Sequence, residues 1–172
     1  MSAFRHLVER HKDVSLSLAC SILKDRSRAE DVLQESFIKV FKKIDTFQFN
    51  AAFTTWLYRI VINTSYNAVK KEKNRHHFTQ EAEEKLATTA DIPIDKLKEN
   101  DQKKYINLAL EKLRSEEALV LRLFYLCELK ISEIAKSTGF STSKIKVDLS
   151  RGRSNLSFQL RKLLGTEIDN LL

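Results

Sequence analysis

Glycine, proline and cysteine are all scarce in this chain of 172 residues, which has 3, 1 and 2 of them respectively. A sheet protein of this length needs many tight turns, and turns depend on glycine and proline. The composition therefore predicts an all-α fold. Cys20 and Cys127 are far apart in sequence and form no metal-ligand pair, so reduced thiols in a cytoplasmic protein are expected.

Long apolar runs are absent as well. No window approaches the roughly 20 apolar residues of a membrane span, and the first residues, MSAFRHLVERHKD, lack an apolar run of signal-peptide length. The sequence therefore predicts a protein that is not inserted in a membrane.

The common catalytic motifs are also missing. There is no phosphate-binding loop, HExxH, CxxC or GxSxG. His6 and His11 lie five residues apart with Cys20 beyond them, a pattern that does not favour zinc, and the acidic residues form no catalytic pair. The sequence therefore predicts no enzyme activity, no cofactor, no metal and no small-molecule substrate.

The charges that are present fall into three blocks. The formal net charge is +7, with 14 basic and 8 acidic side chains in residues 1–78 and 13 basic and 8 acidic in residues 102–172. Between them, residues 79–101 hold 3 basic and 7 acidic side chains and the only proline, and they lose helical periodicity. This pattern predicts two basic helical domains, at 1–76 and 102–166, joined by a flexible acidic linker at 77–101 and followed by a tail at 167–172.

Aromatic and basic side chains meet in the stretch from Asp45 to Arg75. Three phenylalanines, Phe47, Phe49 and Phe53, precede an apolar helix that Thr54 or Thr55 is expected to cap and that ends in several lysines. Rings beside a basic face suit single-stranded nucleic acid, because bases stack on rings and phosphates pair with lysine. The alternative is a helical hairpin with core aromatics and a solvated basic end, which composition alone favours.

The stretch before it predicts two helices. Residues 4–23 carry apolar side chains at helical spacing, as one helix or two joined ones. Ser27 and Glu30 then predict a capping box at the start of the next helix, whose apolar stripe is Ala29, Val32, Leu33, Phe37, Val40, Phe41 and Ile44. Its polar face, which carries acidic residues in the first turns, is either an ordinary solvated surface or a docking face for a partner.

The C-terminal half predicts a helix-turn-helix. Ser115 is expected to cap a buried apolar helix over residues 118–129. Ala135, Gly139 and Ile145 have the spacing of a helix-turn-helix, with Gly139 at the turn and Ser141 as the N-cap of the second helix. That helix leaves a polar and basic set outward or flanking, which suits a major groove: Thr142, Ser143, Lys144, Lys146, Val147, Ser150, Arg151 and Arg153.

Four stretches, in order, resemble the extracytoplasmic-function (ECF) sigma factors, the two-domain initiation factors of bacterial RNA polymerase. They are RAEDVLQESF at residues 28–37, AAFTTWLYRI at 51–60 with Asn63, KKEKNR at 70–75, and the segment from Glu133 to Arg153. The resemblance implies a region 2 in the N-terminal domain and a region 4 in the C-terminal domain. It also implies core RNA polymerase, promoter DNA as duplex and as melted strand, and an anti-sigma factor as partners.

The resemblance also implies three sets of site residues. Core polymerase would bind Asp31, Gln34 and Glu35. The melted minus-ten element would bind Phe47, Phe49, Asn50, Phe53, Thr54, Trp56, Arg59, Asn63, Lys70 and Lys71. The duplex minus-thirty-five element would bind Ser141, Thr142, Ser143, Lys144, Lys146, Ser150, Arg151 and Arg153.

Two positions depart from the family pattern in the helix-turn-helix. Lys130 replaces the usual capping serine, and Asp148 stands where a basic residue is common. Asp148 either pairs with a neighbouring basic side chain or accepts a hydrogen bond from a cytosine amine.

Two other functions remain open on sequence grounds. One is a helix-turn-helix regulator that acts without binding the polymerase core, and the other is a helical adaptor that binds only proteins. The stretch from Asp45 to Arg75 discriminates between these functions and that of a sigma factor, because a protein that reads duplex DNA alone has no use for an aromatic loop before a basic helix.

Overall fold

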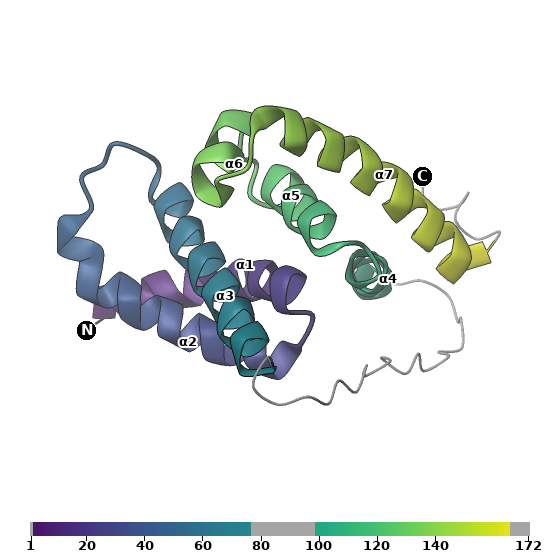
Figure 1. Ribbon diagram of the computed structural model, residues 1–172. Helices are drawn as coiled ribbons and strands as arrows, with labels where there is room; N and C mark the ends of the chain where they lie inside the picture. The colour runs from purple at the N-terminus through teal and green to yellow at the C-terminus, as the bar shows by residue number, and fades with distance from the viewer. Residues whose placement is uncertain (1, 77–98, 166–172) are drawn as a thin grey trace.

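The computed structural model describes residues 2–76 and 99–165, and every regular element in these ranges is helical (Figure 1). The all-α prediction is confirmed. The described elements are α1 (Ser2–Leu23), α2 (Arg26–Lys43), the 3-10 helix η1 (Ile44–Thr46), α3 (Phe53–His76), α4 (Glu99–Glu111), α5 (Ser115–Tyr125), α6 (Ile131–Thr138) and α7 (Thr142–Leu164). Most of the predicted acidic linker and the whole predicted tail lie outside the described residues.

The first three α-helices pack against one another and form the N-terminal unit. Their shared core contains Leu18 of α1, Val40 of α2, and Leu57 and Val61 of α3, all without solvent exposure. Residues 2–23 form one helix rather than two. The predicted apolar stripe of α2 is only partly correct, because Phe41 is 59% exposed and packs edge-on against Phe4 at 5.0 Å between ring centroids.

Two predicted helix starts in the N-terminal unit are wrong. α2 is capped by Asp25, whose Oδ1 accepts from the Arg28 backbone N–H at 3.0 Å, so the predicted capping box of Ser27 and Glu30 does not form. Asp25 is the N-cap because its backbone is extended, with φ −140° and ψ 121°, and this conformation places its carboxylate over the first turn of α2. α3 begins at Phe53, so neither Thr54 nor Thr55 is its cap.

The last four α-helices form the C-terminal unit, in which α7 packs against α4, α5 and α6. Leu119, Val120 and Leu123 of α5 are fully buried, as predicted for the buried helix of this unit. α7 crosses α5 closely at Gly152, where an added Cβ would lie 3.0 Å from Leu121 Cδ1. At the same crossing, Asn155 Nδ2 of α7 donates a hydrogen bond to Glu117 Oε2 of α5 at 2.9 Å.

The helix-turn-helix prediction is confirmed in its geometry. α6 ends at Gly139, whose left-handed φ of +76° is accessible to glycine at little cost. Ser141 Oγ caps α7 by accepting from the Lys144 backbone N–H at 3.2 Å. Ile145 and Leu149 face the core as predicted.

Other helix starts in the C-terminal unit need correction. Ser115 is the first residue of α5 rather than its cap, and the Arg114 side chain that precedes it makes no capping bond. Lys130 has no oxygen to cap α6 with, but Glu133 Oε2 accepts from the Lys130 backbone N–H at 2.8 Å, which satisfies one free amide of the first turn. α4 begins at Glu99, inside the segment predicted as linker.

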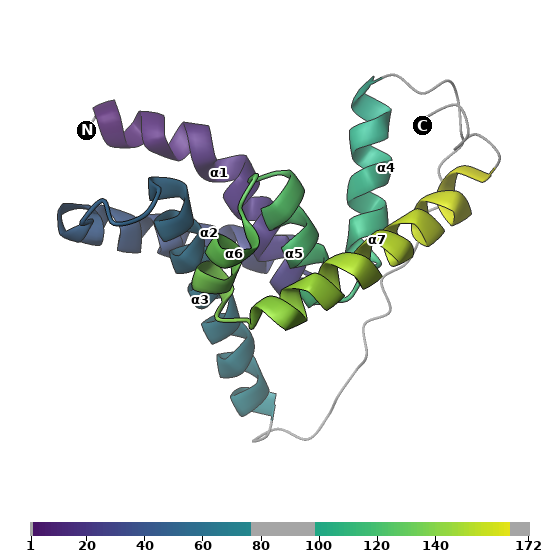
Figure 2. The same ribbon diagram turned by 90° about the horizontal axis from the view of Figure 1, so that it is seen from above.

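The two units touch along two pairs of helices. α5 lies on α1 and α6 lies on α3, and both views show the C-terminal unit seated against α1 and α3 while the outer part of α7 projects away (Figures 1 and 2). Most of the buried apolar residues of both units belong to one continuous cluster.

Candidate nucleic-acid and polymerase interfaces

The loop between α2 and α3 carries a cluster of rings. Phe47 is its centre, with ring centroids 4.7 Å from Phe49, 5.7 Å from Phe53 and 5.2 Å from Trp56. Phe53 and Trp56 are half-buried and 5.6 Å apart. These contacts hold the loop against the first turn of α3, so the rings share one surface.

Phe49 is the outermost ring of this cluster. Its side chain is 85% exposed, and its backbone has φ +55°, a region that bulky side chains rarely adopt. Exposure of a large ring in a strained conformation costs free energy, and such strain is typical of functional positions. The loop therefore presents a ring whose outer face is free to stack.

His11 of α1 contacts the aromatic cluster through Phe53. Its ring lies 5.9 Å from Phe53. Burial, with a smaller contribution from the nearby Arg10, lowers the pKa of His11. A lowered pKa favours the neutral imidazole at physiological pH, so His11 adds little positive charge next to the aromatic cluster.

An exposed polar stripe runs along α3 from this cluster. At about 100° per residue, Trp56, Arg59, Asn63 and Lys70 fall within about 60° of the helix circumference. Arg59, Asn63 and Lys70 are all exposed. The structure therefore brings these predicted minus-ten residues together with the aromatic loop.

Lys71 is the exception in the predicted minus-ten set. It lines a groove of about 450 Å³ between α2 and α3, together with Arg28, Asp31, Val32, Glu35, Thr64, Asn67, Ala68 and Glu72. This groove, called the acidic groove below for Asp31 and Glu35, holds two of the three predicted core-binding residues. The third, Gln34, is exposed on the same helix but is not part of the lining.

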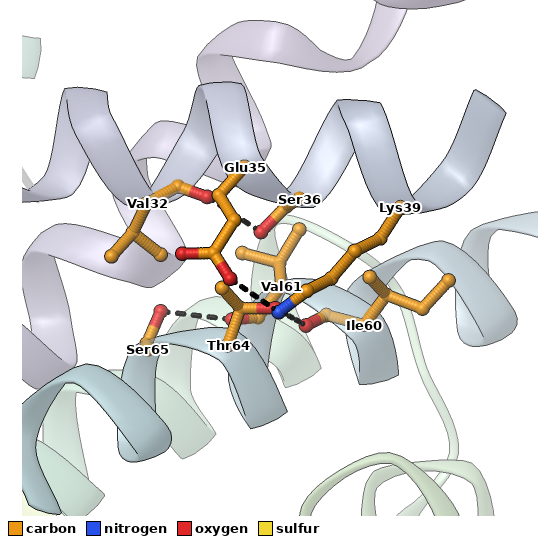
Figure 3. A network of polar contacts seen from close by, with 8 residues as sticks. All are labelled: Val32, Glu35, Ser36, Lys39, Ile60, Val61, Thr64 and Ser65. Atoms are coloured by element: carbon orange, nitrogen blue, oxygen red, sulfur yellow. Dashed lines mark hydrogen bonds and ion pairs between the residues drawn. The ribbon is translucent and has the colours of Figure 1, made fainter. Parts of the chain in front are cut away.

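A chain of polar contacts fixes one wall of the acidic groove (Figure 3). Lys39 Nζ lies 2.6 Å from Glu35 Oε1 and donates to Thr64 Oγ1 at 3.2 Å. Thr64 Oγ1 donates in turn to the carbonyl oxygen of Ile60 at 2.8 Å. The Glu35 carboxylate is therefore held in place by a cation from its own helix.

The sequence could have indicated more of this groove than was predicted. Arg28, Asp31 and Glu35 follow the three- and four-residue spacing of one helix face, and Arg28 forms an ion pair with Glu72 across the groove. The spacing was visible in the sequence, but the pairing of α2 with α3 was needed to identify the opposite wall.

The outer face of α7 is the second candidate DNA surface. Ser141, Thr142, Ser143, Lys146, Val147, Ser150 and Arg151 are all exposed there. Two members of the predicted set are engaged elsewhere. Lys144 lies over the Phe140 ring at 4.7 Å and pairs with Asp148, while Arg153 Nε donates to the Tyr125 hydroxyl at 2.8 Å.

Comparisons with known proteins match both units. The model of Sigma-70 region 2 matches residues 7–75, and the model of Sigma-70, region 4 matches residues 103–156. The chain is 30% identical over 169 residues to the ECF RNA polymerase sigma factor SigW of Bacillus subtilis (strain 168), covering 94% of this chain and 90% of SigW. It is 25% identical over 170 residues to the ECF RNA polymerase sigma-E factor of Haemophilus influenzae, covering 94% and 89%.

Solved structures agree in fold. The sigma factor RpoE of Bartonella quintana, from a co-crystal with the anti-sigma factor NepR, superposes with a TM-score of 0.74 at 19% identity and covers 94% of this chain and 98% of its own. CnrH, solved in complex with the cytosolic domain of CnrY, gives a TM-score of 0.59 at 22% identity, with 94% of this chain and 89% of its own covered.

A helical region 2 followed by a helix-turn-helix region 4 defines a transcription initiation factor of the sigma-70 class. Within that class, the relation to SigW over nearly the whole chain shows that this chain belongs to the ECF sigma factors. It is an RNA polymerase sigma factor that directs transcription initiation. Because a sigma factor is a non-catalytic subunit, family membership also confirms that the chain is not an enzyme.

No helix in the described part of the chain combines the length and apolar character needed to cross a bilayer.

Proposed function

We propose that this sigma factor grips promoter DNA and core polymerase through three separate surfaces. Residues 1–76 act as region 2 and carry two of them, residues 102–166 act as region 4 and carry the third, and residues 77–101 link the two. Residues 167–172 form a tail. The chain works in the cytoplasm, where core polymerase and promoter DNA meet.

The acidic groove and the neighbouring Gln34 dock on core polymerase. Asp31 and Glu35 face one groove, and Glu35 is held by Lys39, which limits the side-chain entropy lost on binding. Carboxylates on an exposed face favour a basic partner surface and raise the association rate at low salt. These features support a core-binding role for Asp31, Gln34 and Glu35.

The aromatic loop and the stripe on α3 bind the melted minus-ten strand. Phe49 offers a free ring face, and Phe47, which contacts Phe49, Phe53 and Trp56, holds it in place. Asn50 and Thr54 follow Phe49 and Phe53 in the chain and contribute polar contacts to the same strand. Arg59, Asn63 and Lys70 continue the surface along the backbone of the strand. Extruding a base costs a few kcal/mol, and stacking returns about 1–3 kcal/mol per base, so one or two stacked bases offset the cost.

The outer face of α7 reads the minus-thirty-five element as duplex. Its exposed set mixes hydroxyls with Lys146 and Arg151, which is the chemistry of phosphate and base-edge contacts. Lys144 and Arg153 flank this face and are bound within the chain in the absence of DNA. We assign them secondary contacts to the DNA backbone.

An anti-sigma factor is the remaining partner. RpoE of Bartonella quintana was crystallised with such a protein, which supports the proposal for this chain. A protein from the source cell that binds the purified chain and, when added back, blocks transcription by the reconstituted holoenzyme would support it. A binder that leaves transcription unchanged would not be the anti-sigma factor.

The observation that carries this function is the free Phe49 ring at the head of the cationic stripe on α3, because a regulator that reads only duplex DNA has no use for it. The test is binding to core polymerase without DNA, followed by transcription in vitro and by binding to forked and fully paired promoter DNA. A sigma factor binds core at micromolar concentration or tighter and prefers the fork. Failure on both counts would favour the helix-turn-helix regulator.

The role of α7 is tested with single substitutions. Lys146→Ala and Arg151→Ala each weaken minus-thirty-five binding, and each lowers the slope of the salt dependence by about 1 if the side chain contacts a phosphate. Lys162→Ala, an exposed change near the end of α7, is the matched control and leaves both quantities unchanged. If neither substitution changes affinity or slope, these residues do not belong to the site.

A further inference from the structure

An apolar side chain stands in the middle of the surface that faces outward on α7. Val147, in the second turn of this helix, is 45% exposed and lies outside the apolar cluster that the described residues form. Valine is also a poorer helix former than alanine, because its branched side chain loses rotamer freedom against the preceding turn. Neither core packing nor helix propensity therefore favours valine at this position.

The place of Val147 on the helix is central. At about 100° per residue, Ser143, Val147 and Ser150 fall within about 60° of the circumference of α7. We call these three residues the central strip. Both serines are exposed, and the buried side chains of Ile145 and Leu149 lie on the opposite side of the helix. A helix that enters a major groove with the central strip first presents Val147 to the edges of the base pairs.

Two cations flank the central strip. Lys146 and Arg151 lie about 70° to either side of it, and both are exposed. Side chains on the flanks of a helix in the major groove face the two sugar-phosphate backbones, which form the walls of the groove. Contacts to phosphate position a protein on the duplex but do not read its sequence. Lys146 and Arg151 therefore suit positioning rather than base readout.

The other two basic side chains in this half of α7 are engaged within the protein. Lys144 Nζ lies 2.6 Å from Asp148 Oδ2 and sits over the Phe140 ring. Arg153 Nε donates to the Tyr125 hydroxyl at 2.8 Å. Arginine or lysine reads guanine, and asparagine or glutamine reads adenine, through paired hydrogen bonds. None of these four residue types lies in the central strip, so its middle cannot read a purine in that way.

The base-edge group that suits valine is the C5 methyl of thymine, which is the apolar group that a base pair presents in the major groove. Val147 has two methyl groups and no donor or acceptor. Contact with the thymine methyl removes apolar surface from water on both sides, whereas contact with a cytosine amine would leave that donor without a partner. The hydroxyls of Ser143 and Ser150 can donate or accept, so they tolerate different bases on either side.

We propose that Val147 is a specificity-determining residue for the minus-thirty-five element, and that it selects thymine at one base pair through contact with the C5 methyl group. This rests on the proposed function for the assignment of α7 to duplex DNA, and it goes further by naming the base and the atom that are read. Apolar contact, rather than hydrogen bonding or charge, carries the selection at this base pair.

The experiment removes one methyl group at a time from the DNA. Holoenzyme reconstituted from the full chain and core polymerase selects its preferred minus-thirty-five element from promoters randomised over that element. Each thymine of the selected duplex is then replaced in turn by deoxyuridine, which lacks the C5 methyl and still pairs with adenine. At one position the replacement weakens holoenzyme binding about three- to fivefold, the factor expected for one methylene-sized group removed from water. This factor stays constant over a salt series, because salt weakens the phosphate contacts instead.

Substitutions at Val147 identify the side chain that makes the contact. Val147→Ala removes both methyl groups and makes binding insensitive to deoxyuridine at that one position. Val147→Ile keeps a branched apolar side chain and retains the sensitivity. Because Val147 is 45% exposed, both variants keep the thermal unfolding midpoint close to that of the wild type.

Arg151→Ala is the control at a neighbouring exposed position. It weakens binding to the thymine and deoxyuridine duplexes by the same factor, since a phosphate contact does not depend on the base. A gain of binding gives the converse test. When cytosine occupies the sensitive position, 5-methylcytosine, which carries a methyl group on the same ring carbon, raises the affinity of the wild-type holoenzyme by about three- to fivefold. The Val147→Ala holoenzyme shows no such gain.

The outcomes separate this proposal from the proposed function. A holoenzyme that selects an element without thymine overturns the role of Val147 and leaves the sigma-factor function standing. Sensitivity to deoxyuridine that is absent, or that persists in Val147→Ala, does the same. A chain that directs core polymerase to no element at all overturns the proposed function, and the reading of thymine with it.

Discussion

Lys144 and Asp148 form an ion pair of 2.6 Å, one turn apart within the recognition helix α7. Asp148 is only 7% exposed and lies on the core side of the helix. Burial raises the pKa of the Tyr66 hydroxyl in α3, and the nearby carboxylates of Glu116 and Asp148 add smaller contributions. Of the two roles that the sequence left open for Asp148, the structure supports pairing with a neighbouring basic side chain. A carboxylate in this position does not oppose the phosphates of a bound duplex.

Loss of this pair should destabilise the C-terminal unit. Lys144→Ala leaves a mostly buried carboxylate without its cation, and we expect a loss of about 1 kcal/mol in the free energy of unfolding, since Lys144 itself is partly exposed. Lys146→Ala, an exposed change two residues further on, should change stability by less than about 0.5 kcal/mol. Denaturant unfolding of both variants measures the difference, and equal values would show that the pair contributes nothing.

Substitution of Phe49 should slow promoter opening and leave the stability of the protein almost unchanged. Phe49→Ala removes an 85% exposed ring, so the free energy of unfolding should change by less than about 0.5 kcal/mol. Loss of a stacked base at about 1–3 kcal/mol predicts a decrease of roughly five- to 150-fold in open-complex formation. Permanganate footprinting and circular dichroism measure the two effects.

The matched variant is Phe53→Ala. Phe53 is half-buried and touches Phe47, Trp56 and His11, so its loss should lower both stability and opening. If Phe49→Ala opens promoters at the wild-type rate, the exposed ring is not a stacking platform.

Loss of the Asp31 charge should weaken binding to core polymerase and nothing else. Asp31→Asn keeps the shape of the side chain but removes its charge, and we expect core polymerase affinity to fall by roughly five- to tenfold at low salt, with a smaller effect at high salt. Asp45→Asn, an exposed change just before the aromatic loop, is the control. Binding measured by fluorescence anisotropy over a salt series checks this, and equal losses for both variants would indicate a general charge effect rather than a site.

Alkaline pH should weaken the contact between the units. Cys127, just after α5, shares a hydrogen bond with Tyr58 of α3, and burial raises the pKa of Cys127 to about 12 and also raises that of Tyr58. Since burial at this contact disfavours the thiolate, the stability that Cys127 contributes is fully present below its ordinary pKa of about 8.5 and is lost as the pH rises from there toward 12. At pH 10 this loss is at most about 2 kcal/mol, at about 1.4 kcal/mol per unit.

The thermal unfolding midpoint between pH 7.5 and 10 measures this effect. Cys127→Ser, which does not ionise in this range, should flatten the profile, whereas Cys20→Ser retains the Cys127 contribution. A profile for Cys127→Ser that matches the wild type would place the alkaline loss in other groups.

The sequence by itself determined the helical class, the two basic units, the helix-turn-helix and the aromatic loop. Each of these depends on local chemistry. Apolar spacing selects one face of a helix, Gly139 supplies the positive φ of the turn, and Ser141 supplies the cap, all within a few residues along the chain.

The tertiary structure decided which competing local signals prevailed and what long-range partners the side chains found. Asp25 rather than Ser27 starts α2, Lys71 faces the acidic groove rather than the aromatic loop, and Lys144 turns toward Asp148. Arg122 lies in the helix that the sequence predicted to be buried, but its partner Ser17 is 105 positions away. No local pattern encodes that contact, because it arises only when the faces of α1 and α5 meet.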